Sequence, residues 1–258
     1  MTAAIRVEHV MGMVVTIDVR EPFEDRGAID TVIAWLHEVD GRFSTYRDDS
    51  EITRLGREEI HLDEVSADCR YVLDMCLELT KMTSGAFDAF TVPAPNGTML
   101  DPSGFVKGWS IERAALLLEQ AGATNFCINA GGDIVLRGEP RPGDAWRVGI
   151  RHPHHRQMLA LALELRERSA VATSATYERG AHIIDPTTCS PTTELASATV
   201  VGPDLGLADA FATAVFVMGR GGVEWIETQP GYDAYIVTHD DMTHWSSGFP
   251  HPGVTAVG

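Results

Sequence analysis

An aspartate and a threonine four residues apart lie in a segment that has almost no other polar side chain. The segment reads Ala208-Asp209-Ala210-Phe211-Ala212-Thr213-Ala214. On a helix, residues i and i+4 share a face, so the carboxylate and the hydroxyl would lie close together. Two hard oxygen donors suit Mg²⁺, which often bridges to a substrate phosphate. The structural alternatives are a carboxylate near a helix N-terminus and a threonine bonded back to a carbonyl.

A second candidate segment precedes a predicted helix and contains a lysine. It reads Asp101-Pro102-Ser103-Gly104-Phe105-Val106-Lys107. Free N–H groups at a helix N-terminus, together with the charge of Lys107, could hold a phosphate or pyrophosphate. The G-x-x-x-x-G-K spacing of a P-loop is absent. The alternative is a helix-entry loop with an exposed lysine.

Two further segments interrupt regular elements with polar residues. Asn129-Ala130-Gly131-Gly132-Asp133 joins two predicted strands, and its glycines permit positive φ or a close backbone approach. A plain hairpin turn would explain it equally well. His182 stands before the short apolar run Ile183-Ile184, where a histidine can be structural or catalytic.

Three histidines, His152, His154 and His155, lie between two predicted strands. Their spacing is not a metal signature, so we expect a solvated hairpin tip at this position.

Hydrophobic periodicity and turn residues predict the elements that would position these side chains. Helices are expected over 29–39, 65–82, 109–120, 207–218 and 221–228, with 84–107 as a loop. Strands are expected over 13–19, 125–129, 133–137, 146–151, 159–165, 170–173, 198–201 and 234–238, followed by a loose tail after residue 246. Short spacing between strands indicates antiparallel neighbours, and the segregation of strands from helices indicates an α+β fold.

Composition limits the classes of protein that fit. Twenty Lys and Arg against 37 Asp and Glu give a net charge of −17, which argues against a nucleic-acid surface. The four cysteines form no C-x-x-C pair, and no stretch is long enough to span a bilayer. The first residues contain no apolar segment before a cleavage site, so we expect a cytoplasmic protein. The 258 residues could form one domain or two intimate subdomains.

Taken together and in order, these segments resemble the ApbE-type flavin transferases, FAD:protein FMN transferases, in a short form without an export signal. The resemblance starts at Met11-Gly12 and continues through Phe43–Tyr46, Gly85–Asp88, Asp101–Gly108 and Asn129–Asp133. It ends with Ser174, Tyr177–Arg179, His182–Pro186 and Ala208–Thr213. The stretch between Asp88 and Asp101 is shorter than in most members.

The resemblance implies an ApbE-like fold of mixed, largely antiparallel sheets packed with helices, and it implies roles for individual residues. The Mg²⁺ ligands would be the Gly104 carbonyl, Asp209 and Thr213, and His182 is the candidate for proton transfer. FAD would be lined by Met11, Tyr46, Ala86, Phe87, Asp88, Asp101, Lys107 and Ile184.

The implied reaction is Mg²⁺-dependent transfer of the FMN moiety of FAD to a Thr or Ser hydroxyl of an acceptor protein, with release of AMP. Two alternatives stay open. Water could replace the acceptor, which would make the protein an FAD pyrophosphatase. The shortened stretch after Asp88 could instead mark an FAD-binding protein without catalysis.

Overall fold

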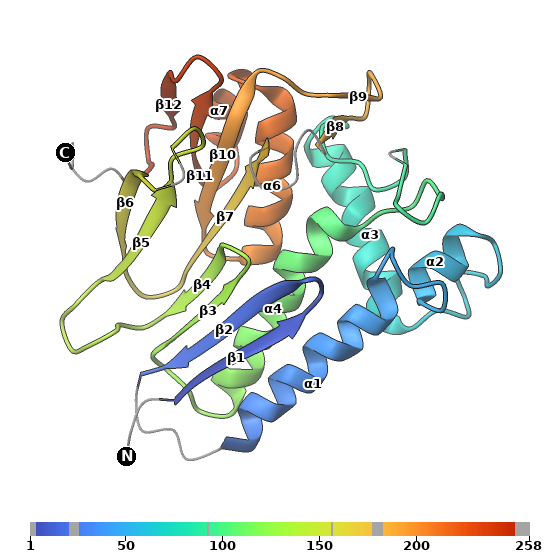
Figure 1. The fold of residues 1–258 in the computed structure, drawn as a ribbon, viewed down its shortest axis with the longest axis horizontal. Helices are drawn as coiled ribbons and strands as arrows, with labels where there is room; N and C mark the ends of the chain where they lie inside the picture. Colours follow the sequence, from blue (N-terminus) through green and yellow to red (C-terminus); the bar gives the residue numbers. More distant parts are fainter. Residues whose placement is uncertain (1–3, 21–25, 92, 156, 177–182, 251–258) are drawn as a thin grey trace.

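An eight-stranded sheet, in which every pair of neighbours is antiparallel, organises the molecule (Figure 1). The structure, a computed structural model, describes residues 4–20, 26–91, 93–155, 157–176 and 183–250. Across the sheet the strands are β1 (Ala4–Val10), β2 (Met13–Val19), β3 (Phe126–Ala130), β4 (Asp133–Arg137), β7 (Ser169–Ala175), β10 (Leu195–Gly202), β11 (Asp233–Thr238) and β12 (Thr243–Trp245).

Helices cover one face of this sheet and a hairpin covers the other. The helices α4 (Ser103–Gln120) and α6 (Leu205–Met218) pack on the sheet, and α1 (Arg26–Phe43) packs on α4 (Figure 1). The opposite face carries the hairpin of β5 (Trp146–Arg151) and β6 (Leu159–Leu165). The remaining elements are α2 (Glu51–Gly56), α3 (Ala67–Met82), α7 (Gly221–Ile226), β8 (Ile184–Asp185) and β9 (Ser190–Pro191). Among the described residues, no helix is both long and apolar enough to cross a membrane.

Side chains of the central strands alternate between two cores, as the period of two in a strand requires. Ala198 and Val200 of β10 face the helices, whereas Val201 faces the hairpin. In β11, Ile236 faces the helices and Tyr235 faces the hairpin. Because both faces are covered, every residue of β10 is buried.

The structure confirms the α+β class and the antiparallel pairing, and it corrects several boundaries. The helix expected from residue 109 begins at Ser103, so Lys107 lies inside a helix and not in a loop. The Asp101 side chain accepts the Ser103 N–H at 3.0 Å and so satisfies a main-chain donor at this end. Strands β1 and β12 and helix α2 were not expected, since they are short or lie at a sheet edge.

The tail after residue 246 is also more ordered than expected, as far as residue 250. Ser246 is buried and donates a hydrogen bond to Asp233 at 2.6 Å. Phe249 is buried and stacks on Tyr235, with ring centroids 5.7 Å apart. Its packing depends on β11, which a local sequence pattern does not reveal.

The helices α4 and α6 approach each other closely at Gly108. A Cβ atom at this position would lie 2.4 Å from the Leu205 carbonyl oxygen and 2.7 Å from the Asp209 Cβ. Only a residue without a side chain fits there, because the nearest atom is main chain and cannot rotate away.

We expect Gly108→Ala to lower the free energy of unfolding by about 2 kcal/mol, because overpacking outweighs the better helix propensity of alanine. The matched control is Gly41→Ala in α1, where a Cβ meets nothing within 4 Å. That change should stabilise the protein by up to about 1 kcal/mol. Urea denaturation measures both, and equal effects would contradict the close contact.

Candidate functional site

Three charged side chains from three separate elements meet beside this helix contact. The Lys107 ammonium of α4 lies 2.5 Å from an Asp133 carboxylate oxygen and 3.3 Å from an Asp209 carboxylate oxygen. Both carboxylates are buried, with 2% and 5% of their side chains exposed, whereas 31% of Lys107 is exposed. The two acidic groups therefore form the floor of the site, and the lysine lies between them and solvent.

Asp133 is placed by the turn between β3 and β4. Gly131 and Gly132 have φ values of +61° and +103°, so this segment is a tight hairpin turn, as one of the two interpretations held. Asp133 is the first residue of β4, and its carboxylate accepts the Thr173 N–H of β7 at 3.1 Å. The turn thus also places the buried carboxylate of Asp133 in the site.

Burial and charge set the protonation of this cluster. Burial raises the pKa of Asp209 to about 7; the nearby Lys107 opposes this shift and Asp133 adds to it. Burial alone would lower the pKa of Lys107, but attraction to Asp133 and Asp209 outweighs it and raises the pKa. Lys107 is therefore charged, and it compensates part of the negative charge buried beneath it.

Oxygen donors collect next to the cluster on the same face of α6. The Thr213 hydroxyl lies one turn after Asp209 and 3.3 Å from the Ser174 hydroxyl of β7. Gly104 lies opposite, where an added Cβ would be 3.8 Å from the Thr213 hydroxyl oxygen. The structure therefore brings Gly104, Asp209 and Thr213 to one place.

The main-chain N–H of Gly108 forms a hydrogen bond with one of these oxygens. In a regular helix this N–H would bond to the carbonyl of Gly104. It also lies 2.9 Å from the Asp209 carboxylate, to which it donates a hydrogen bond. The hydrogen bond fixes the carboxylate and competes with the carbonyl of Gly104 for the same donor.

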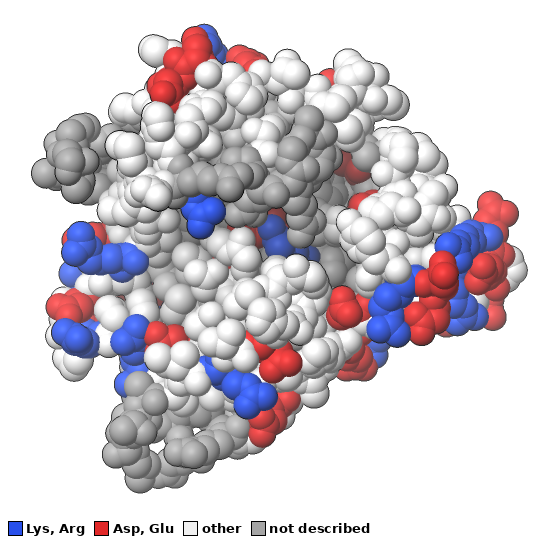
Figure 2. All heavy atoms as spheres, viewed as in Figure 1, with Lys and Arg blue, Asp and Glu red and all other residues white. Residues whose placement is uncertain are grey.

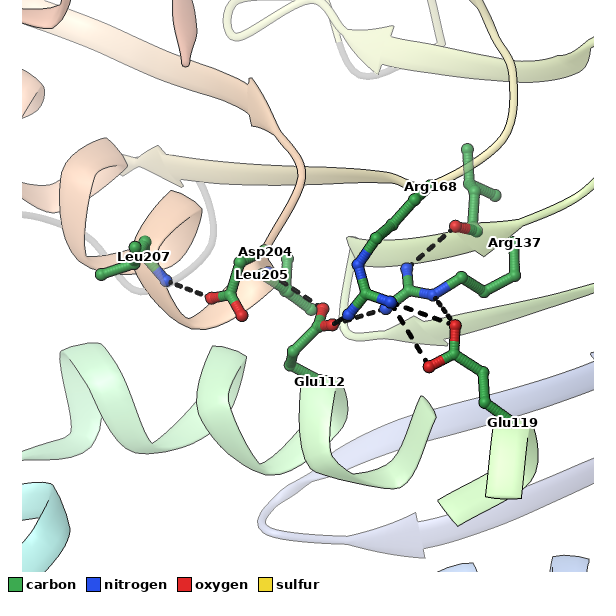
Figure 3. Close-up of polar contacts among 8 residues, drawn as sticks. Glu112, Glu119, Arg137, Arg168, Asp204, Leu205 and Leu207 are labelled. Carbon is green, nitrogen blue, oxygen red and sulfur yellow. Dashed lines mark hydrogen bonds and ion pairs between the residues drawn. The ribbon is translucent and has the colours of Figure 1, made fainter. Parts of the chain in front are cut away.

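Asp209 is not a helix-end residue, so that structural alternative for it is wrong. Helix α6 begins at Leu205, and its N-cap is Asp204, whose side chain accepts the Leu207 N–H at 3.0 Å. The Leu205 N–H donates a hydrogen bond of 3.1 Å to the carboxylate of Glu112, a buried residue of α4 (Figure 3). Asp209 lies one turn further along the helix.

Glu112 belongs to a network of ion pairs that fixes α6 relative to the sheet. Arg137, at the end of β4, and Arg168 each lie 2.5 Å from one Glu112 oxygen (Figure 3). Both arginines also contact Glu119 of α4, at 2.7 and 3.1 Å. Burial raises the pKa of Glu112 and the arginines oppose this shift. The network thus connects the start of α6 to the strand that begins with Asp133.

Some residues expected to line FAD contact α4 or lie at its start. The Phe87 ring lies against Gly104, where a Cβ would be 3.1 Å from its Cε2. The Met11 sulfur accepts a hydrogen bond from Ser110 of α4 at 3.7 Å. Asp101 precedes α4, and its N–H bonds to the Ala89 carbonyl, which brings it near the segment that also holds Ala86 and Asp88.

Other expected residues do not pack into the cluster or cannot be placed. Tyr46 lies between α1 and α2 with 80% of its surface exposed, and Ile184 is half-buried in β8. His182 lies outside the described residues. Asp133 was not among the expected site residues, although its segment was noted. Its position beside Lys107 depends on the pairing of β4 in the sheet, which the sequence did not reveal.

The surface at this place is concave. Seen as in Figure 1, the space-filling view is hollowed near its middle, close to where α4 meets α6 (Figure 2). Basic and acidic atoms lie inside the hollow, whereas many other charged side chains of this face lie toward its edges. A hollow with a charged floor is a suitable place for a polar ligand.

The sequence model of the ApbE family matches residues 11–96 and 91–236. This chain belongs to the ApbE family. A curated relative from Haemophilus influenzae, named FAD:protein FMN transferase, is 26% identical over 282 residues, which cover 85% of this chain and 82% of the relative. The relative of that name from Vibrio cholerae is 29% identical over 241 residues, which cover 72% of this chain and 71% of the relative.

Solved structures agree with this assignment. The flavin transferase ApbE from Vibrio cholerae superposes with a TM-score of 0.83 at 25% identity, covering 96% of this chain and 98% of that chain. The ApbE protein from Thermotoga maritima gives 0.84 at 21% identity, with the same coverage, and supports the fold alone. The ApbE-like fold expected from the sequence is confirmed.

We expect Lys107→Met to lower the free energy of unfolding by about 3 kcal/mol in buffer with EDTA, because Asp133 and Asp209 then lose their buried counter-charge. The control is Lys81→Met in α3, whose lysine is 70% exposed and pairs with Glu78. That change should lower the free energy of unfolding by less than about 0.5 kcal/mol. Chemical denaturation at one pH measures both, and similar values would contradict the role of Lys107.

Proposed function

We propose that this ApbE-family protein transfers the FMN moiety of FAD to a Thr or Ser hydroxyl of an acceptor protein, in a reaction that needs Mg²⁺ and releases AMP. One observation carries the proposal: buried carboxylates, a hydroxyl and a lysine converge at a concave surface in a chain whose curated relatives are FAD:protein FMN transferases.

The residues present fit Mg²⁺. Asp209, Thr213 and the Gly104 carbonyl offer hard oxygen atoms, the donor type that Mg²⁺ prefers. The Gly108 N–H donates to the Asp209 carboxylate and holds it against α4. The charges support the same conclusion: when both carboxylates are ionised, they and the single ammonium leave one negative charge in excess at the floor of the site, which a bound cation would compensate.

When bound, Mg²⁺ would neutralise charge that develops on the pyrophosphate oxygens. Lys107 is proposed to hold a phosphate oxygen of FAD, since its ammonium lies between the buried acids and solvent. Phe87 and Met11 would contact the rings of FAD, and Asp101 with the segment 86–88 would form the edge of the pocket. Tyr46, exposed in this structure, and Ile184 are proposed to line FAD as well.

The acceptor hydroxyl attacks the phosphorus on the flavin side of the pyrophosphate. A new P–O bond forms to the acceptor, the bridging P–O bond breaks, and AMP leaves with its electron pair. The hydroxyl proton must be removed, and His182 is proposed as the general base. The reaction depends mainly on positioning and electrostatic stabilisation, as in other phosphoryl transfers.

The direct test incubates the purified protein with FAD, Mg²⁺ and an acceptor protein carrying a Thr or Ser flavinylation motif. We expect a covalent flavin on the acceptor by mass spectrometry, together with AMP in equal amount. Excess EDTA should abolish the product, and added Mg²⁺ should restore it. AMP without flavinylated acceptor would identify a pyrophosphatase, and FAD binding without AMP would identify a flavin-binding protein.

We expect Asp209→Asn and Thr213→Val each to lower the transfer rate by about 100-fold or more, because a metal ion at a phosphoryl centre contributes several kcal/mol to the transition state. The control is Asp204→Asn on the same helix. Asparagine caps a helix about as well as aspartate, so stability and transfer should stay close to those of the wild type. A wild-type rate in either site variant would exclude the assigned metal ligands.

A further inference from the structure

We propose a second metal site, for a transition-metal ion of the zinc type, between the β5–β6 loop and the β11–β12 turn. One potential ligand atom from each of His152, His155 and Asp241 lies within 4.8 Å of the other two. The site is separate from the Lys107 cluster and does not depend on the proposed transferase activity.

The fold brings these two loops together. The β5–β6 hairpin packs through Val148, Ile150 and Leu163 against a core that includes Tyr235 and Val237 of β11. The loop that follows β5 therefore lies beside the turn that follows β11, as Figure 1 shows. The histidines were expected to form a solvated hairpin tip; what the sequence did not indicate is an aspartate from a turn more than eighty residues later.

Ligand groups approach Asp241 from several sides. The Nε2 atoms of His152 and His154 each lie 3.7 Å from the same Asp241 oxygen. The ring centroids of His152 and His155 are 4.8 Å apart, and His239 places a further imidazole 6.1 Å from that of His154. Four imidazoles and a carboxylate thus lie in one small region of the surface.

This donor set selects the class of ion. Imidazole nitrogen and carboxylate oxygen are ligands of Zn²⁺ and of similar divalent transition metals, whereas Mg²⁺ prefers oxygen alone. Tetrahedral Zn²⁺ with ligands at 2.0–2.2 Å places ligand atoms about 3.4 Å apart. Closing from 4.8 Å requires only side-chain rotation, because His155 and Asp241 are exposed.

Binding has one local requirement. The main-chain N–H of His154 donates to Nδ1 of the His152 ring at 3.2 Å. A neutral His152 ring therefore carries its proton on Nε2, which faces Asp241. A metal bond at Nε2 moves that proton to Nδ1, and the main-chain N–H of His154 then bonds to water. The exchange gives up one long hydrogen bond in an exposed loop.

The test is a Zn²⁺ titration of untagged, chelator-stripped full-length protein by isothermal calorimetry at pH 8, with excess Mg²⁺ present to occupy oxygen sites. We expect saturable binding of one Zn²⁺ per chain and a Tm that rises with Zn²⁺ concentration, since a ligand of the folded state stabilises it. Co²⁺ in place of Zn²⁺ should give the visible absorption of a tetrahedral site with nitrogen ligands.

Two variants and one control assign the binding to this cluster. His155→Ala and Asp241→Asn should each weaken Zn²⁺ binding at least tenfold and remove the rise in Tm. Asparagine tolerates the positive φ of 64° at position 241, so the turn keeps its shape. His61→Ala, between α2 and α3, should bind like the wild type. Absence of saturable binding, or equal binding by all variants, would overturn the proposal.

Discussion

The contact between α4 and α6 at Gly108 is the constraint on which the candidate site depends. Because position 108 has no side chain, the Leu205 carbonyl and Asp209 can lie directly against α4. The same approach lets the Gly108 N–H bond to Asp209 and lets Glu112 bond to the Leu205 N–H. One missing Cβ therefore fixes the position of Asp209, the start of α6 and, through α4, the position of Lys107.

The electrostatics of the site follow from this packing. Asp133 and Asp209 are buried where water cannot solvate their charge, and a single ammonium lies between them. Burying two carboxylates near one lysine costs free energy, which the large helix–sheet core offsets. Such an arrangement does little for stability, and it is consistent with the cation and the anionic ligand that the proposed function assigns to this site. The Glu112 network lies further along α4, at the start of α6, and its acidic and basic groups are paired with one another, as a purely structural network should be.

The shortened stretch between Asp88 and Asp101 raised the alternative of a flavin-binding protein without catalysis. In the structure, residues 94–98 of this stretch form a turn that is hydrogen-bonded to α2. The Ala94 N–H bonds to the Thr98 carbonyl at 2.8 Å, and Asn96 donates to Thr53 of α2 at 2.9 Å. Thr98 is buried against Gly56 at the end of α2. The turn is thus fixed against α2, and the bond from the Asp101 N–H to the Ala89 carbonyl holds Asp101 at the start of α4.

The sequence by itself determined the α+β class, the antiparallel pairing, the bounds of several strands and the i, i+4 pairing of Asp209 with Thr213, because these features follow from local periodicity and turn residues. It also carried the resemblance to the ApbE family, since that depends on the order of short motifs. Only the tertiary structure showed that Lys107 lies in a helix between two buried acids, that Asp133 joins the site, and that Asp241 meets His152. Each of these contacts joins segments far apart in the chain, and packing of helix on helix and hairpin on sheet decides them.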